Sequence, residues 1–206
     1  MQPLPFVDTR AQLAFTIAAG LFAVLQLTSS VVSGVRSGRS TAHHVRLDRS
    51  SLPFVILCAG LGVLGAARSA TGLTGAAIAP GLPELRWLLF GLGIVVMVTG
   101  SAVRLWAITT LGRWFTYDVR VTEGQPVVQT GPYRWVRHPS YTGVLLVLLG
   151  IGLTLGNWLS VVLIVVLPTV GLVRRIRVEE DALLGTIGEP YERYAAAKPR
   201  LFPGLW

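Results

Sequence analysis

The sequence is short of cysteine and of charge. Cys58 is the only cysteine in 206 residues, so disulfides, a four-ligand zinc site and a three-cysteine iron–sulfur cluster are excluded within one chain. We expect no metal site. Charged residues make up 14% of the chain and hydrophobic residues 52%, with a mean hydropathy of +0.61. These values are unlike those of a soluble domain and indicate an integral membrane protein.

Acidic residues are scarcer than basic ones, and the formal net charge is +8. The basic residues are scattered between apolar segments instead of forming one stripe, so we expect no nucleic-acid partner. Fourteen of the 18 fall in segments 36–51, 109–140 and 174–206. This asymmetry predicts that these segments are cytoplasmic, so the carboxyl terminus lies on the cytoplasmic side and the amino terminus on the outer side. The expected location is a bacterial inner (plasma) membrane.

Apolar runs of about 20 residues predict membrane-spanning helices. Without a basic region before it, the first run is expected to be a true span and not a cleavable signal peptide. Gly156-Asn157 leaves almost no connection between the last two runs, which predicts a tight helical hairpin. The predicted fold is an all-α integral membrane protein with five transmembrane helices, Leu13–Val35, Leu52–Ala70, Leu85–Ile108, Tyr141–Gly156 and Trp158–Val173.

Two polar segments interrupt the membrane pattern, and both are predicted to be cytoplasmic. Residues 109–140 are too long for a mere linker, and residues 174–197 are predicted as two short helices broken at Gly188-Glu189-Pro190. We expect the 109–140 loop and the C-terminal helices to form a cytoplasmic cofactor pocket. The chain then divides into residues 1–84, with the first two spans, and a functional core at residues 85–206.

A glycine pattern in the second span looks like a dinucleotide motif. Gly60-Leu61-Gly62-Val63-Leu64-Gly65 fits G-x-G-x-x-G, but it lies inside an apolar run with no strand before it. We therefore expect these glycines to serve helix packing.

The densest group of polar and aromatic residues is Arg137-His138-Pro139-x-Tyr141. Pro139 disfavours helix for His138, so a helix is expected to begin at about Pro139, with free N–H groups that suit an anion. Arg134 and Trp135 fit a membrane–water interface. Such an interface needs no histidine, so His138 and Tyr141 are expected to be functional.

Glu180 shares the apolar face of the predicted helix with Ile176 and Leu183. Burying an unpaired carboxylate is costly, so Glu180 must find a cation, a hydrogen-bond donor or a ligand. The neighbouring charged residues are expected on a solvated face, namely Arg177, Glu179 and Asp181.

Together these motifs resemble a known family. Arg137-His138-Pro139-x-Tyr141-x-Gly143, an apolar hairpin, Glu179-Glu180-x-x-Leu183 and Gly188-x-x-Tyr191-x-x-Tyr194 resemble the isoprenylcysteine carboxyl methyltransferases and their phospholipid methyltransferase relatives, over roughly residues 85–206. The resemblance implies a membrane enzyme that binds S-adenosylmethionine in a cytoplasmic pocket. Its acceptor would be a lipophilic molecule from the bilayer, for example the carboxylate of an isoprenylcysteine.

The resemblance also implies roles for individual residues. Glu180 and Arg175 are the catalytic candidates, the former toward the cofactor and the latter toward the acceptor. Arg177 is the alternative acceptor contact, because it lies closer to Glu180 on a helical wheel. The implied cofactor-binding residues are Gln129, Thr130, Gly131, Tyr133, His138, Tyr141 and Glu180.

Alternatives remain at this point. A carboxylate acceptor is ionised near neutrality and needs no base, whereas an amine or phenol would need His138 or Glu180 to remove a proton. The motif around Arg137-His138-Pro139 also resembles NADPH-dependent membrane sterol-type reductases, although the short chain and Glu179-Glu180 favour a methyltransferase. A small transporter or scaffold would be expected to carry ionisable groups inside its spans.

Overall fold

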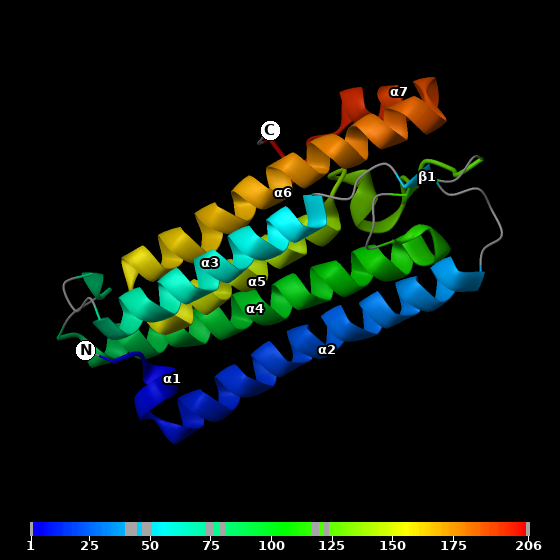
Figure 1. Ribbon diagram of the computed structural model, residues 1–206. Coiled ribbons are helices and arrows are strands. Elements are labelled where there is room, and N and C mark those ends of the chain that lie inside the picture. Colours follow the sequence, from blue (N-terminus) through cyan, green and yellow to red (C-terminus); the bar gives the residue numbers. More distant parts are fainter. Residues whose placement is uncertain are drawn as a thin grey trace.

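A computed structural model of the protein describes residues 2–39, 45–46, 51–72, 76–78, 81–116, 120–121 and 124–204. Helices dominate it (Figure 1). A short antiparallel pair, β1 (Val45–Arg46) and β2 (Arg120–Val121), joins two connecting segments. The helices are α1 (Leu4–Val7), α2 (Thr9–Arg39), α3 (Ser51–Gly72), α4 (Pro83–Leu111), η2 (Gly112–Trp114), η3 (Gly131–Arg134), α5 (Pro139–Leu155), α6 (Trp158–Ile187) and α7 (Glu189–Ala197).

The predicted all-α membrane fold is confirmed. Among the described residues, α2, α3, α4 and α6 are long and apolar enough to cross a membrane. The apolar helix α5 has 17 residues, or about 25 Å, which is at the lower limit for a span. The count of five spans therefore stays a prediction.

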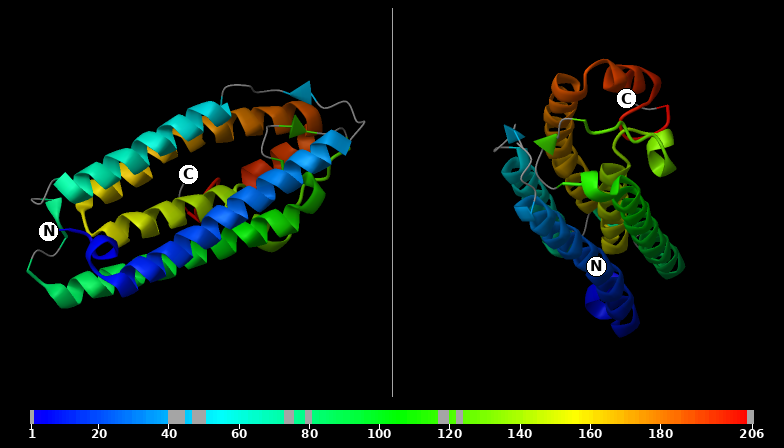
Figure 2. Two further views of the ribbon diagram at one scale, coloured as in Figure 1. Left: turned by 60° about the horizontal axis from the view of Figure 1, so that its bottom comes forward. Right: turned by 90° about the vertical axis from the view of Figure 1, so that its right-hand side faces the viewer.

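The long helices lie side by side, and each contacts the next in the spatial order α2, α4, α5, α6 and α3 (Figures 1 and 2). Glycines allow the closest approach, between α4 and α5. A Cβ on Gly100 would lie 2.6 Å from the Gly143 carbonyl oxygen, and one on Gly150 would lie 2.5 Å from that of Gly93. In α3, a Cβ on Gly62 would lie 3.0 Å from the Leu163 carbonyl oxygen, which confirms a packing role for that glycine.

The predicted hairpin between α5 and α6 is confirmed. Gly156 ends α5 in the left-handed region at φ +62°, and the Asn157 side chain caps α6 by accepting from the Ser160 N–H at 3.1 Å. The Ser160 hydroxyl lies 2.9 Å from that of Ser69, so α3 is held to the same turn.

Helix α6 differs from the prediction. The last span was predicted to end at Val173, with its helix continuing past the interface, and residues 174–197 were predicted as two short helices. One helix runs from Trp158 to Ile187, so the first of these short helices is the continuation of the span. No proline stands between Val173 and Gly188, and Gly185 and the buried Pro168 both lie within the helix. The break at Gly188 is as predicted, and α7 begins at Glu189 with Pro190 in its first turn. Arg175 and Glu180 therefore belong to the same continuous helix as the apolar span.

Candidate active site

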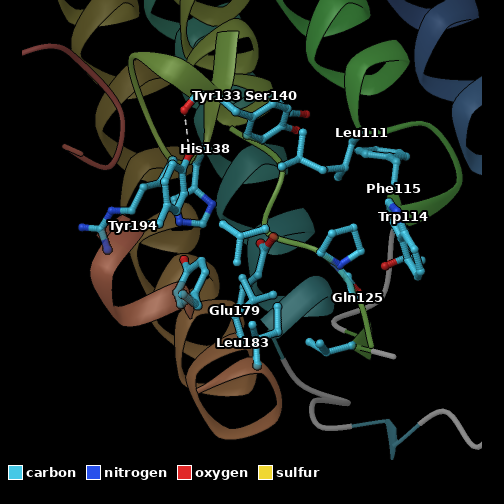
Figure 3. A pocket seen from close by; sticks show the side chains of 18 of the residues that line it. Leu111, Trp114, Phe115, Gln125, Tyr133, His138, Ser140, Glu179, Leu183 and Tyr194 are labelled. Atoms are coloured by element: carbon cyan, nitrogen blue, oxygen red, sulfur yellow. Dashed lines mark hydrogen bonds between the residues drawn. The ribbon is translucent and has the colours of Figure 1, made fainter. Parts of the chain in front are cut away.

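A cavity opens between the two polar segments of the chain. The space within it, including its open mouth, is about 890 Å³. Its walls come from the end of α4, residues 114–116, 121 and 125–128, the segment that leads into α5, the start of α5, and helices α6 and α7. Figure 3 shows Tyr133, His138 and Tyr194 on one side of this view, and Leu111, Trp114 and Phe115 on the other.

The start of α5 carries the Arg-His-Pro motif, and it begins at Pro139 as predicted. The C-terminal segment holds the backbone in place. The N–H groups of Arg137 and His138 donate to the carbonyls of Pro199 and Arg200, both at 2.9 Å. Both Arg137 and His138 line the cavity, so the carboxyl end of the chain fixes one wall of the site.

Glu180 is buried behind that wall, only 5% exposed. Its Oε1 lies 2.8 Å from Arg137 and 3.0 Å from His138 Nε2, and its Oε2 accepts from Arg200 Nε at 2.9 Å. The expectation that this carboxylate finds buried partners is confirmed. Because both oxygens are engaged with protein groups, Glu180 does not line the cavity, whereas its neighbour Glu179 does.

The predicted position of Glu179 on a solvated face of α6 is wrong. A solvated face was expected, but Glu179 is half-buried, lines the cavity and accepts a hydrogen bond from the Tyr141 hydroxyl at 2.7 Å. Arg175 Nε donates to the same hydroxyl at 2.9 Å, and another Arg175 nitrogen donates to the Ser51 hydroxyl at 3.2 Å. The helical wheel missed this arrangement because α5 and α7 cover a flank of α6 that the wheel treats as open.

Besides Glu180, four predicted residues do not line the cavity. Arg177 is exposed and does not line it, and Gln129 and Thr130 are exposed as well. Residues 125–128 supply that part of the wall instead. Gly131 has φ +55° and turns against α4, where an added Cβ would lie 2.7 Å from the Thr110 hydroxyl.

The sequence analysis missed Arg104. This residue of α4 is 4% exposed and donates to the Ser140 hydroxyl at 2.7 Å, and it also hydrogen-bonds the side-chain oxygen of Gln26 on α2. Ser140 lines the cavity. The sequence feature that could have identified Arg104 is its position inside a predicted span, since ionisable residues at such positions often mark functional sites.

Two polar atoms at the cavity have no partner. Arg137 Nε and the Tyr191 hydroxyl are buried and form no hydrogen bond in the part of the chain that the structure describes. Both residues line the cavity. Leaving such groups unpaired costs free energy, so this corner is suited to a ligand that accepts hydrogen bonds.

The tyrosines outside the spans are held in their neutral form. Burial, and then the charge of Glu179, raises the pKa of Tyr133 well above its ordinary value. Burial and the nearby charge of Glu180 do the same to the pKa of Tyr191, and burial raises the pKa of Tyr194 to about 12. The Tyr194 hydroxyl donates to the Tyr133 carbonyl at 2.7 Å. At neutral pH these residues offer aromatic faces and O–H groups to the cavity.

Comparisons with known proteins point to the same family as the paired motifs. Residues 92–185 match the model of the Isoprenylcysteine carboxyl methyltransferase (ICMT) family, which confirms the resemblance indicated by the paired motifs. A "Probable protein-S-isoprenylcysteine O-methyltransferase" of Oryza sativa subsp. indica is 34% identical over 125 residues, covering 60% of this chain and 65% of the relative. The "Protein-S-isoprenylcysteine O-methyltransferase" of Tribolium castaneum is 33% identical over 117 residues, covering 56% of this chain and 41% of the relative.

A solved structure shows the same fold. The eukaryotic intramembrane Ras methyltransferase ICMT superposes with a TM-score of 0.69 at 20% identity, covering 98% of this chain and 70% of that one. The chain spans slightly less than two thirds of the length of the plant relatives that it matches.

Proposed function

We propose that this protein is an S-adenosylmethionine-dependent methyltransferase that methylates the carboxylate of a lipophilic, isoprenylcysteine-like acceptor drawn from the membrane. The observation that carries the proposal is that Arg137 and Tyr191, two residues that line a cavity rich in aromatic rings, each carry a buried donor, Arg137 Nε and the Tyr191 hydroxyl, with no hydrogen-bond partner among the described residues. The names of the relatives support the same reaction class.

The residues of the cavity fit S-adenosylmethionine. Its carboxylate end matches the two donors at Arg137 and Tyr191. Its positive charge matches the Glu179 carboxylate and the faces of Tyr133 and Tyr141. When bound, the cofactor would supply a methyl group on a positively charged sulfur.

Some of the remaining proposed cofactor-binding residues line the cavity, and others act through a neighbouring side chain. His138 lines the cavity and stacks on the ring of Tyr141, with ring centroids 5.6 Å apart. Glu180 acts through Arg137 and His138, whose side chains it holds. Residues 125–128 take the place that the sequence suggested for Gln129, Thr130 and Gly131.

Arg175 is the proposed acceptor contact. Its guanidinium is fixed by Tyr141 and Ser51, so little conformational entropy remains to be lost when a carboxylate binds. An acceptor carboxylate is already ionised at neutral pH and needs no base. The task of the chain is to hold this anion in line with the methyl group and to exclude water.

Among the described residues, all those that line the cavity lie within the proposed core at residues 85–206. The N-terminal segment contributes from behind, since Ser51 at the start of α3 binds Arg175. We place the cavity on the cytoplasmic side of a bacterial inner membrane, with the amino terminus outside, because of the bias in Lys and Arg.

Calorimetric titration of the purified, detergent-solubilised protein tests the cofactor. We expect S-adenosylmethionine and its demethylated product to bind with one-to-one stoichiometry and NADPH not to bind. Binding of NADPH alone would favour the reductase alternative, and binding of neither would leave a transporter or scaffold. Reporter fusions at the carboxyl terminus test the orientation, and a reporter active only outside the cytoplasm would contradict it.

A further inference from the structure

Arginines stack on aromatic rings at three places around the end of the bundle that carries the cavity. All three arginines are exposed. We call these pairs the arginine–aromatic belt: Arg113–Trp114, Arg134–Trp135 and Arg174–Phe54, with guanidinium carbons 4.6, 3.9 and 4.9 Å from the ring centroids. The belt is independent of the hydrogen bonds that build the cavity.

Tryptophans on α4 place the belt relative to a bilayer. Trp87 and Trp106 are 43% and 46% exposed, and they lie about 28 Å apart along the helix axis at about 1.5 Å per residue. A hydrocarbon core is about 30 Å thick, and tryptophan favours its two interfaces. Trp106 meets Trp135 edge to face at 5.6 Å, so the Arg134–Trp135 pair lies at the same interface as Trp106.

Helix α6 indicates a similar depth on another side of the bundle. Trp158 at its start is 59% exposed, and Arg174 lies about 24 Å further along the axis. A long arginine side chain can bridge the few remaining ångströms to the headgroups. Arg174 stacks on Phe54 of α3, whereas Trp135 next to Arg134 contacts Trp106 of α4, so these two pairs lie at a similar depth on different sides of the bundle.

Each pair adjoins the wall of the cavity. Trp114 itself lines the cavity, Arg134 follows the lining residue Tyr133, and Arg174 precedes the lining residue Arg175. The same short segments thus turn one side chain inward and the next outward.

We propose that the arginine–aromatic belt binds the headgroups of anionic phospholipids and so holds the cavity at headgroup depth. A guanidinium matches a phosphate with two parallel hydrogen bonds, and the ring beneath it keeps its plane fixed at the interface. The anionic surface of a cytoplasmic leaflet attracts such residues. This inference does not depend on the proposed reaction.

Lipid selectivity of the full chain tests the belt. The protein is reconstituted in phosphatidylcholine vesicles that contain either brominated phosphatidylglycerol or brominated phosphatidylcholine, and quenching of tryptophan fluorescence gives the relative association of the two lipids. We expect wild-type protein to prefer phosphatidylglycerol. Each replacement of a belt arginine by glutamine should lower the preference by up to about fivefold. The variant R113Q/R134Q/R174Q should have lost it.

Two controls make the test specific. Arg193 on α7 is also highly exposed but lies outside the belt, so R193Q should keep the wild-type preference. R134K keeps the charge but loses the two parallel hydrogen bonds and the planar stacking, so it should keep only part of the preference that R134Q loses. If the triple variant does not fold, the comparison of R134K with R134Q decides the question. An unchanged preference in R134Q, or an equal loss in R193Q, would overturn the proposal. So would abolition of the preference by inorganic phosphate but not by chloride at equal ionic strength, because the site would then bind a soluble anion.

Discussion

Two adjacent carboxylates on α6 sit in contrasting surroundings. Glu180 is enclosed by Arg137, His138 and Arg200, and its two oxygens are engaged within the protein. Glu179 is half-buried, lines the cavity and accepts from Tyr141. A carboxylate whose two oxygens bind protein groups stabilises the cavity wall, whereas a carboxylate that lines the cavity can also contact a ligand. We therefore propose that the pair Glu-Glu divides support and recognition between two neighbouring residues.

The largest expected effect comes from breaking the enclosed side. Glu180→Gln leaves Arg137 and Arg200 without their shared anion, and removing one partner of a buried ion pair typically costs about 3–5 kcal/mol. We expect a clearly lowered melting temperature in detergent, with cofactor affinity lost as a consequence of the displaced Arg137 and His138. A Glu180→Gln protein with wild-type melting temperature would contradict the supporting role.

Glu179→Gln is the matched control, since the same isosteric change is made one residue earlier. Here the lost contact is a charge-assisted hydrogen bond with Tyr141, together with the negative charge facing the cavity. We expect a nearly unchanged melting temperature and roughly tenfold weaker binding of S-adenosylmethionine by calorimetry. If Glu179→Gln binds normally and a folded Glu180→Gln does not, the roles of the two carboxylates are reversed.

Which of these features the sequence could predict depends on the range of the interactions. The helix start at Pro139, the break at Gly188 and the hairpin at Gly156-Asn157 follow from local backbone preferences, and all three were predicted. The burial of Glu180 also followed from its place on the apolar face of the helix. These are properties of one segment at a time.

The division between Glu179 and Glu180 depends on other segments. A helical wheel gives the angle of each side chain but not what covers it, and here Tyr141 of α5 covers the flank that carries Glu179. The role of Arg200 was equally hidden, because it requires the carboxyl end to return to the start of α5. Residues 125–128 replaced Gln129 and Thr130 at the cavity because the loop turns against α4 at Gly131.

Arg175 and Arg177 extend the comparison to cations on the same helix. Arg175 is buried and bonded to Tyr141, and Arg177 is exposed. Arg175→Ala should leave cofactor affinity nearly intact and lower kcat/KM for the acceptor, by about tenfold to a hundredfold for a lost charge-assisted contact. Arg177→Ala should match wild type. Methyl-transfer kinetics under identical detergent conditions check both, and activity lost only in Arg177→Ala would move the acceptor contact to that residue.

Alkaline pH gives the smallest effect and concerns the tyrosines beside the enclosed carboxylate. Burial raises the pKa of Tyr194 to about 12, whereas an unfolded tyrosine has a pKa of about 10. Between these values the unfolded chain has released a proton that the folded chain still holds. The stabilisation from neutral Tyr194 is therefore fully present below about pH 10 and is lost as the pH rises toward about 12.

Tyr194→Phe should flatten this fall, and at neutral pH it should cost about 1 kcal/mol, because the hydrogen bond to the Tyr133 carbonyl is lost. Melting temperatures measured across this pH range, with Tyr194→Phe beside wild type, check both parts. An equally steep fall in the variant would assign the alkaline sensitivity to other groups, and a larger loss at neutral pH than in Glu180→Gln would mean that α7, and not the ion cluster, is the main support of the cavity wall.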